Sequence, residues 1–511
     1  VGVTERLLIN GNGLRDTATG IASVTNQGAS GDAGNVLVKA RQLEILNRGA
    51  IVSSTFGHGD AGVVSIRSQY LLITKGISGE DTTGISSNAE RGSTGDAGMV
   101  VIDSGHIELS DSGEINSNSR GRGDAGTIKI DTATLDIQRQ GQIVTSTFGD
   151  GQGGEINIKA KRIFVKNGLR NGVLTGITSS AENGSIKHAG IVTINADDIE
   201  VSNGGEILAA SFPLALGDAG SVVISADKLV VGDRGYIASG TFGAGNAGNV
   251  KIIADDLSIL GSGIITSTAE KKSQGNAGNV FINANNLSVH DRGQISSAAF
   301  GLGNAGGVNI SAHVLQVAGG DIRTQGSGST GGQIRLYADK LIYLLNADTT
   351  SSGIQPAPGT SLITLQAPVI GLNNSRVESL TGSGQSLQGS GEARLLGDTT
   401  IISADSIVAA SSSVETTGLQ TNLSSGLQIP TGTFLDADRL LRESCSAQGR
   451  TARSTFIRTG GGGLPPSPDR PLSALNMAPP QQAAAAGDEQ TMAAAPAGIL
   501  PCPDQAPKPQ S

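Results

Sequence analysis

The sequence lacks tryptophan and has few aromatic or charged residues. Of its 511 residues, 3% are aromatic and 16% are charged, and the formal net charge is −9. No cluster of Lys and Arg stands out, which argues against nucleic acid as a partner, because nucleic-acid binding depends on basic patches. No run of about eighteen apolar residues is present, so we expect no membrane-spanning helix.

Segments with a sustained helical period are also missing. Glycine accounts for 75 residues, and glycine disfavours helices because it loses more conformational entropy than other residues when a helix forms. A fold of alternating strands and helices is therefore excluded. The low counts of cysteine (two) and methionine (three) are compatible with an extracellular β-protein.

One four-residue motif, Gly-Asp-Ala-Gly, recurs along the chain. Its copies, including those with Asn in place of Asp and two looser versions, begin at positions 31, 59, 95, 123, 151, 187, 217, 245, 275 and 303. Successive copies are 28 to 36 residues apart, most often 28. A fixed period of this length is typical of stacked-repeat proteins.

Each repeat predicts three short strands separated by three corners. β-Branched and aliphatic residues such as Val36 and Val38 follow the motif at a spacing of two, which indicates a strand with one buried face. A second strand carries pairs such as Leu43 and Ile45, and a third, such as 143–147, follows a corner that contains glycine. This pattern predicts an all-β fold, a parallel β-helix of about ten or more turns.

The regularity of the repeat divides the chain into four segments. We predict β-helix repeats over 1–346, irregular terminal β-helix turns over 347–433, a C-terminal cap and signature over 434–472, and a disordered Ala/Pro/Gln-rich tail over 473–511. Residues 434–442 fit a short capping helix over the open end. Residues 1–30 match the second half of a repeat, so we expect the chain to begin inside a repeat of a longer protein.

Three turns carry extra residues at one corner. The insertions lie within 75–83 and 166–174, and a third lies within 10–19. If the turns stack in register, these loops project from one edge of the solenoid, and insertions on one face often mark a binding face. Tolerated loop variation is the alternative interpretation.

The repeat and the C-terminal region resemble a known family. The consensus GDAGNVxIxAxxLxIxxxGxIxSxTFGxG is similar to that of the large exoproteins related to filamentous haemagglutinin, in the form common in cyanobacteria. Residues 406–412 resemble the family's closing S-x-I-x-A-S-S turn. Cys445 with 454–468 resembles its C-terminal signature, in which Gly461 stands where Arg is usual.

This resemblance implies a right-handed β-helix that is exported by two-partner secretion through an outer-membrane barrel. It also implies a secreted or cell-surface location, associated with the outer membrane, and a role in adhesion or surface contact. The family's N-terminal secretion domain is not part of this sequence, so the export route rests on the resemblance.

Arg122, Gly123 and Asp124 spell the tripeptide that integrins read in some adhesins. Gly123 and Asp124 belong to the repeat, and Arg122 fills a variable slot that Ser30 and Thr94 fill elsewhere. The repeat alone accounts for the tripeptide, so integrin-type recognition is a minor hypothesis.

The Asp of the motif forms a column that resembles a cation ladder. Carboxylates about 4.8 Å apart would repel by roughly 1–3 kcal/mol per neighbouring pair, and a calcium ion would relieve that repulsion. However, Gln152, His188 and Asn246 occupy the same slot, and the calcium-binding nonapeptide is missing. We predict that the slot needs a hydrogen-bond acceptor for an Asx-type turn, which explains every residue but His188, and that no metal or other cofactor binds.

No catalytic constellation is recognisable, although some β-helices cleave polysaccharides. The five histidines fall at different positions of the repeat: His58, His106, His188, His290 and His313. The third strands are rich in Ser and Thr without acidic pairs, which indicates structural hydroxyl ladders rather than an active site. We therefore predict that the protein is not an enzyme.

Cys445 and Cys502 are the two cysteines. They are able to form a disulfide outside a reducing compartment. Two unpaired thiols are the alternative.

Together these patterns predict a secreted, rod-shaped surface exoprotein that acts in adhesion or in contact with the extracellular matrix. The expected partners are cell-surface or matrix glycans or proteins and, by resemblance, the secretion barrel. Weak contacts repeated along a stiff rod would add through multivalency. Two alternatives stay open: a polysaccharide-active enzyme on the same fold and a structural surface-layer component.

Overall fold

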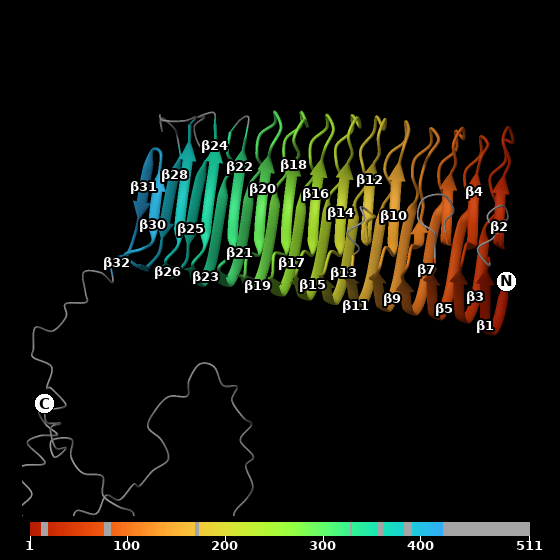
Figure 1. Ribbon diagram of the computed structural model, residues 1–511, viewed down its shortest axis with the longest axis horizontal. Coiled ribbons are helices and arrows are strands. Elements are labelled where there is room, and N and C mark those ends of the chain that lie inside the picture. Colours follow the sequence, from red (N-terminus) through yellow and green to blue (C-terminus); the bar gives the residue numbers. More distant parts are fainter. Residues whose placement is uncertain are drawn as a thin grey trace, which may run out of the picture. The chain divides into compact units, whose positions relative to one another are not determined.

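The computed structural model describes most of the chain as a single stack of strands (Figure 1). It describes residues 1–11, 19–75, 83–168, 173–327, 330–354, 361–382 and 391–422. Within these residues every regular element is a strand. Parallel strands stack into a β-solenoid of about 13 turns, which confirms the predicted fold class.

The chain divides into two units, Val1–Ile429 and Pro430–Ser511. The second unit lies outside the described residues, as do the predicted cap over 434–472, the tail over 473–511 and the two cysteines, Cys445 and Cys502.

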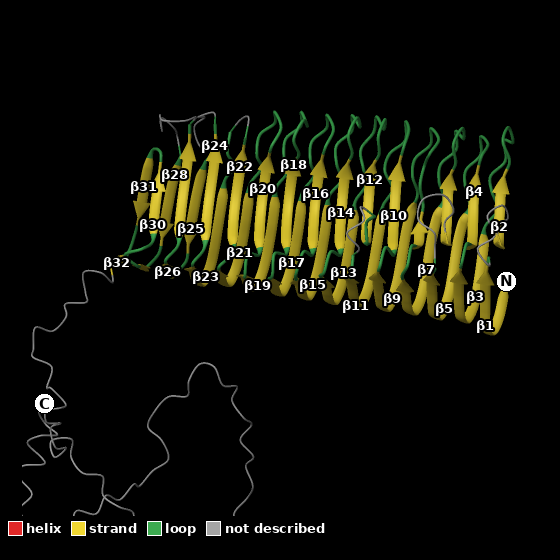
Figure 2. Ribbon diagram, in the orientation of Figure 1, coloured by secondary structure: helices red, strands yellow, loops and turns green. Residues whose placement is uncertain are grey.

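Most turns contribute one long and one short strand, and the two kinds form separate sheets (Figure 2). We call them the long-strand sheet and the short-strand sheet. The long-strand sheet contains β1 (Gly2–Asn10), β3 (Val36–Leu46), β5 (Val63–Thr74), β7 (Met99–Leu109), β9 (Thr127–Gln138), β11 (Ile156–Lys166), β13 (Val192–Val201), β15 (Val222–Val231), β17 (Val250–Ile259), β19 (Val280–His290), β21 (Val308–Ala318), β23 (Ile334–Leu345), β25 (Leu362–Gln366), β26 (Val369–Asn373), β28 (Glu392–Leu396), β29 (Thr399–Ile402), β31 (Ser413–Thr416) and β32 (Leu419–Asn422). The short-strand sheet contains β2 (Thr19–Thr25), β4 (Gly49–Thr55), β6 (Thr83–Ala89), β8 (Gly113–Asn116), β10 (Gln142–Thr147), β12 (Gly176–Ala181), β14 (Glu206–Ser211), β16 (Tyr236–Thr241), β18 (Ile264–Ala269), β20 (Gln294–Ala299), β22 (Asp321–Gly326), β24 (Asp348–Gly353), β27 (Arg376–Thr381) and β30 (Ile407–Ala410).

The predicted columns of Val and Ile fill the core. In-register pairing places Val100 beside Ile128, and Ile128 beside Ile156, in the long-strand sheet. The short strands add Ile115 and Ile143 from the other side. All five side chains are fully buried. Each stacks on its equivalents in neighbouring turns, so the core is continuous along the solenoid, which a single turn cannot achieve.

The polar corner expected between the first two strands of a turn is a bend within one long strand. In β3, Ala40 and Leu43 are buried, whereas Arg41 is exposed and Gln42 is partly exposed between them. Every turn bends at the equivalent place, so the hydrogen-bond ladder between turns continues on both sides of the bend. The two halves separate only near the end of the described solenoid, where β23 pairs with both β25 and β26.

The corner before most short strands is a tight turn. Ahead of β8, Asp111 and Ser112 have positive φ angles of 47° and 63°, and the Gly113 N–H donates to the Ser110 carbonyl at 2.9 Å. This is the geometry of a type I′ turn. Gly113 is required for space, because a Cβ there would lie 2.2 Å from the carbonyl oxygen of Ile73 in the preceding turn.

The three predicted insertions all fall at this corner. They lie between β1 and β2, between β5 and β6, and between β11 and β12. The inserted residues 12–18, 76–82 and 169–172 lie outside the described residues.

Candidate functional site

The Gly-Asp-Ala-Gly corners form a ladder of hydrogen bonds between turns. The Asp60 N–H donates to Asp32 Oδ1 at 2.9 Å, and the Asp96 N–H donates to Asp60 Oδ1 at 2.8 Å. The Asp60 carbonyl in turn accepts the Ala33 N–H at 2.8 Å. The slot does use a hydrogen-bond acceptor, as predicted, but its partner is the backbone of the next turn rather than an Asx turn of its own.

His188 is part of the same ladder, although the Asx interpretation left it unexplained. Its Nδ1 accepts the Asp218 N–H at 2.9 Å. A neutral imidazole nitrogen is an acceptor, so the imidazole takes the place of the carboxylate or amide oxygen of other turns. In the part of the chain that the structure describes, no group of three or more His, Cys, Asp or Glu residues is placed to hold a metal ion.

The tripeptide Arg122, Gly123 and Asp124 is one rung of this ladder. Asp124 donates its N–H to Asp96 Oδ1 at 2.8 Å and accepts the N–H of the next slot residue, Gln152, through its own Oδ1 at 2.7 Å. The Arg122 guanidinium is exposed and lies 3.9 Å from a carboxylate oxygen of Asp150. Arg122 and Asp124 are exposed and Gly123 is buried, so the tripeptide lies within a stacked corner rather than at the tip of a loop.

The histidines contact different neighbours on separate turns. His58 lies 3.0 Å from the Thr94 hydroxyl, and His106 stacks on Tyr70 with ring centroids 5.2 Å apart. Burial raises the pKa of Tyr70 to about 12, and its hydrogen bond to Glu108 at 3.0 Å acts in the same direction. The histidines share no common site.

Inward-facing hydroxyls of the short strands tie the two sheets to the Gly-Asp-Ala-Gly corners. Ser267 is fully buried, donates to the Gly248 carbonyl at 2.8 Å, and accepts the Gly278 N–H at 2.9 Å. The predicted structural hydroxyl ladder is thus present, and it bonds to backbone groups.

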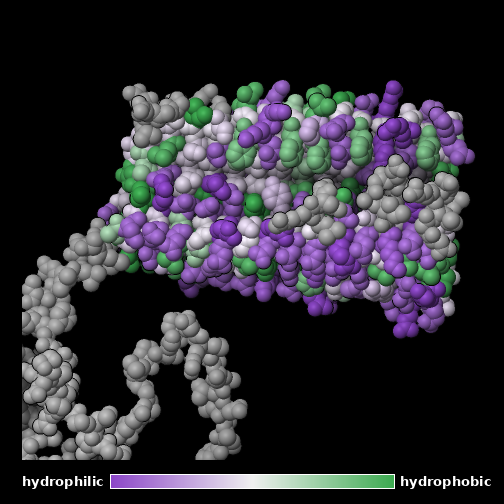
Figure 3. Space-filling model, in the orientation of Figure 1, coloured by the Kyte–Doolittle hydropathy of each residue, from purple (hydrophilic) through white to green (hydrophobic). Residues whose placement is uncertain are grey.

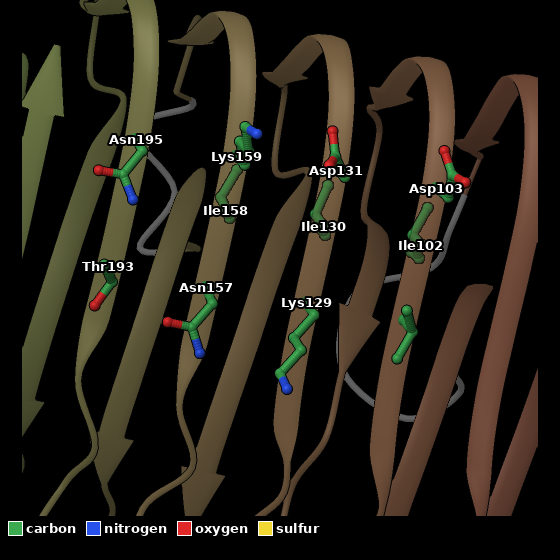
Figure 4. Close-up of a pocket in the computed structure, with 11 residues that line it drawn as sticks. Ile102, Asp103, Lys129, Ile130, Asp131, Asn157, Ile158, Lys159, Thr193 and Asn195 are labelled. Carbon is green, nitrogen blue, oxygen red and sulfur yellow. The ribbon is translucent and has the colours of Figure 1, made fainter.

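The outer face of the long-strand sheet carries a shallow hollow of about 470 Å³ across β7, β9, β11 and β13 (Figure 4). Asp103, Asp131 and Lys159 occupy equivalent positions on three adjacent strands, and Lys129 and Asn195 lie beside them. All five are exposed to water. Exposed ion pairs are worth little in water, so this hollow is an open polar surface of mixed charge.

A second hollow of about 350 Å³ lies further along the same face, on β17, β19 and β21. Ile253 and Phe281, which are 43% and 40% exposed, form its apolar part. Lys251 and Arg335 lie at its edges. The sequence analysis missed both hollows, because it followed the buried positions of each strand and not the alternate positions that face outward.

Hydrophobic residues gather along the upper edge of the view in Figure 3, over the loops that follow the short strands. Leu214 and Leu302 are 79% and 76% exposed in these loops. The lower edge, where the long strands lie, is mostly hydrophilic.

The outer face of the short-strand sheet differs from these surfaces, because its side chains are small and mostly buried. Two adjacent rows of outward-facing residues, each aligned across the strands, form the floor of what we call the short-strand channel. One row is Ser86, Asn116, Val144, Thr178, Leu208, Ala238, Thr266 and Ser296, and the other is Ser54, Asn88, Asn118, Ser146, Ser180, Ala210, Gly240, Thr268 and Ala298.

Larger side chains border this floor on both sides. One wall is the row before the floor; it includes Glu114, Gln142, Glu206 and Tyr236, and it is interrupted by Gly84 and Gly176. The other wall is the row after each short strand: Phe56, Glu90, Arg120, Phe148, Glu182, Phe212, Phe242, Glu270 and Phe300. Phe212 and Phe242 stack with centroids 5.9 Å apart, and the Arg120 guanidinium lies 5.5 Å from the Phe148 ring centroid. The floor residues thus lie between two rows of mostly larger side chains.

Several floor groups are hydrogen-bonded to the walls, but three are unpaired. Asn116 Nδ2 donates to Glu114 Oε1 at 2.7 Å, and Ser180 Oγ donates to Glu182 Oε1 at 2.7 Å. Asn116 Oδ1 and the hydroxyls of Ser54 and Thr178 are buried without a partner among the described residues. Each such group costs on the order of 1–3 kcal/mol.

Burial also perturbs the acidic groups of the walls. It raises the pKa of Glu114 and Glu182, against the opposing effect of their hydrogen bonds from Asn116 and Ser180. It raises the pKa of Glu206 with no opposing contribution. The walls therefore carry acidic groups in a poorly hydrated environment, which disfavours their charged form.

Sequence reasoning recognised the Ser and Thr residues of the short strands but not this channel. It treated all of the hydroxyls as structural, whereas only the inward ones bond the corners. The available signal was the alternation within each short strand, together with the Phe or Glu that often follows it.

The described residues include no helix that is long and apolar enough to span a membrane. No protein-family model matches the chain, and neither a curated protein nor a solved structure matches it.

Proposed function

We propose that this protein is a secreted, rod-shaped exoprotein that holds its carrier to a surface or an extracellular matrix. One observation carries the proposal: the short-strand channel presents the same kind of floor and walls on successive turns from β4 to β20. Equivalent groups on adjacent turns are about 4.8 Å apart. A long partner would meet many weak contacts at once, and such contacts add through multivalency.

The construction of the solenoid supports a mechanical role. Its core runs without interruption from Ile9 to Leu395, and the corner ladder joins the turns at their edges. A rod of this kind keeps its surface groups at fixed spacings. The proposal includes export through an outer-membrane two-partner secretion barrel, which is supported by the resemblance of the repeat to the filamentous-haemagglutinin-related exoproteins.

Adhesion of beads coated with the purified protein tests this function. We expect the beads to bind cell surfaces or matrix preparations, and free protein to compete. Beads that bind none of these surfaces would contradict the proposal, and ordered self-assembly without surface binding would favour a surface-layer component instead. Release of reducing ends from a polysaccharide would favour the enzymatic alternative.

A further inference from the structure

We infer that the short-strand channel between β8 and β16 binds an uncharged, hydroxyl-rich glycan chain that runs along the solenoid axis. The inference rests on the proposed surface contact and names the chemical class of its ligand. Four features support it: the unpaired floor groups, the aromatic wall, the acidic groups of both walls and the direction of the rows.

The floor contains polar atoms that lack a partner. Asn116 is 1% exposed, and its Nδ2 is bonded to Glu114 while its Oδ1 is unpaired. Strand alternation points this side chain outward, because its neighbour Ile115 lies in the core. Thr178, two strands away in the same row, also has an unpaired hydroxyl. A sugar hydroxyl both donates and accepts, so it satisfies an amide oxygen and a threonine hydroxyl alike.

One wall supplies apolar surface for a sugar ring. Phe148 and Phe242 are each 40% exposed, and Phe212 stacks on Phe242. Ligand sites commonly combine aromatic side chains with a few polar groups that fix orientation. The C–H faces of a sugar fit the rings while its hydroxyls reach the floor.

The acidic groups of both walls, with no free cation among the described wall residues beside them, select against an acidic chain. Glu114 and Glu206 lie on one side, and Glu182 and Glu270 lie on the other. Among the described wall residues from β6 to β20, Arg120 is the one cation, and its guanidinium lies 3.3 Å from the Glu90 carboxylate. Uronate or sulfate groups would therefore lose hydration beside acidic groups, with no unpaired cation among these described wall residues to compensate.

The direction of the rows favours a polymer over a single sugar. The floor rows cross the strands, so their members repeat once per turn at about 4.8 Å. Entry requires the long Glu and Gln side chains of the walls to rotate away from the floor. Such rotations do not require the backbone to move.

Isothermal titration calorimetry of the full chain tests the inference. The probes are four neutral hexasaccharides (cello-, laminari-, malto- and xylohexaose) and hexagalacturonate as the acidic counterpart. We expect at least one neutral probe to bind at least tenfold more tightly than hexagalacturonate. If no neutral probe binds, or if hexagalacturonate binds equally well, the inference is wrong.

Two variants locate the site, and one serves as a control. Asn116→Ala removes the unpaired acceptor and should weaken binding about tenfold, the effect of one hydrogen bond. Gly240→Tyr should abolish binding by filling the floor. A Cβ at Gly240 meets no close contact, because the nearest atom, the Thr268 carbonyl oxygen, is 3.7 Å away. Asn195→Ala, on the outer face of the long-strand sheet, should bind as the parent does.

Both channel variants could bind as the parent does, with unchanged circular dichroism and melting temperatures. That result would show that the glycan does not bind in the channel. The outcomes also separate this inference from the proposed function. Coated beads that adhere although no neutral hexasaccharide binds would refute the ligand class and leave surface contact standing. If a hexasaccharide binds in the channel but the coated beads do not adhere, the ligand class stands and the proposed surface contact is refuted.

Discussion

The outer faces of the two sheets differ, although both are built from the same repeat. On the long-strand sheet, Lys129, Asp131 and Lys159 are exposed around an open hollow. On the short-strand sheet, the equivalent outward positions hold Asn116 and Ser146, which are 1% and 2% exposed. Both faces alternate with core residues in the same way.

The difference arises from the size of the outward side chains and of their neighbours. A short strand has two outward floor residues between its two walls, and the walls include Glu, Phe and Tyr. A long strand bends in its middle and spreads its outward side chains over a wider surface. The core residues thus do not determine the outward residues. The two outer faces differ because their outward side chains differ in size.

The largest loss of stability is expected when a corner glycine is replaced by alanine. The same replacement of a glycine on the channel floor is the comparison. A Cβ at Gly126 would lie 1.7 Å from the Gly98 carbonyl oxygen. Gly126→Ala should therefore lower the free energy of unfolding by about 3 kcal/mol or more. Gly240→Ala should change it by about 1 kcal/mol or less, because the floor has room for the methyl group. Denaturation followed by circular dichroism measures both, and equal losses would break the distinction between packed corners and an open floor.

A smaller loss is expected when an inward hydroxyl is removed. Ser267→Ala leaves the Gly278 N–H and the Gly248 carbonyl without their partner, at a cost of about 1–3 kcal/mol. Ser225→Ala, on the outer face of the long-strand sheet, is the matched control and should cost less than about 0.5 kcal/mol. Similar melting temperatures for the two variants would show that inward hydroxyls do not hold the corners.

The hydrogen-bond ladder at the corners allows a test of whether the Asp position needs an acceptor or a negative charge. Asp124→Ala removes the acceptor of the Gln152 N–H and should cost about 0.5–1.5 kcal/mol. Asp124→Asn keeps an oxygen in place and should stay within about 0.5 kcal/mol of the parent. Two results together would favour a cation ladder: a large loss of stability in the Asn variant, and stabilisation by added calcium of the parent but not of the variant.

The smallest effect concerns pH and the channel wall. Burial raises the folded-state pKa of Glu206 above its ordinary value of 4.5. Its contribution to stability is therefore fully present below pH 4.5 and is lost as the pH rises through the folded-state pKa. Glu206→Gln should gain melting temperature relative to the parent between pH 4.5 and pH 7.5.

Glu155→Gln is the control for the loss of one negative charge on the exposed long-strand side. If Glu206→Gln shows no gain relative to that control, the wall is as well hydrated as the outer face of the long-strand sheet.

The fold could be predicted because its signals are local and repeated. Alternation at Val36 and Val38 marks a strand wherever it occurs, and its recurrence with each motif indicates stacking. The need for glycine at the last position of the motif follows only from the structure, since the obstacle to a Cβ at Gly126 is the backbone of the turn before it.

The sequence by itself determined the β-solenoid, its period, the identity of its core columns and the corner at which insertions occur. Only the tertiary structure decided that His188 accepts a bond from the next turn and that Asn116 is buried beside Glu114. It also decided that Val144 and Thr178 lie beside Asn116 on one floor. The reason is physical: each of these properties depends on which residues stack about 4.8 Å away, in a turn roughly 30 residues distant along the chain.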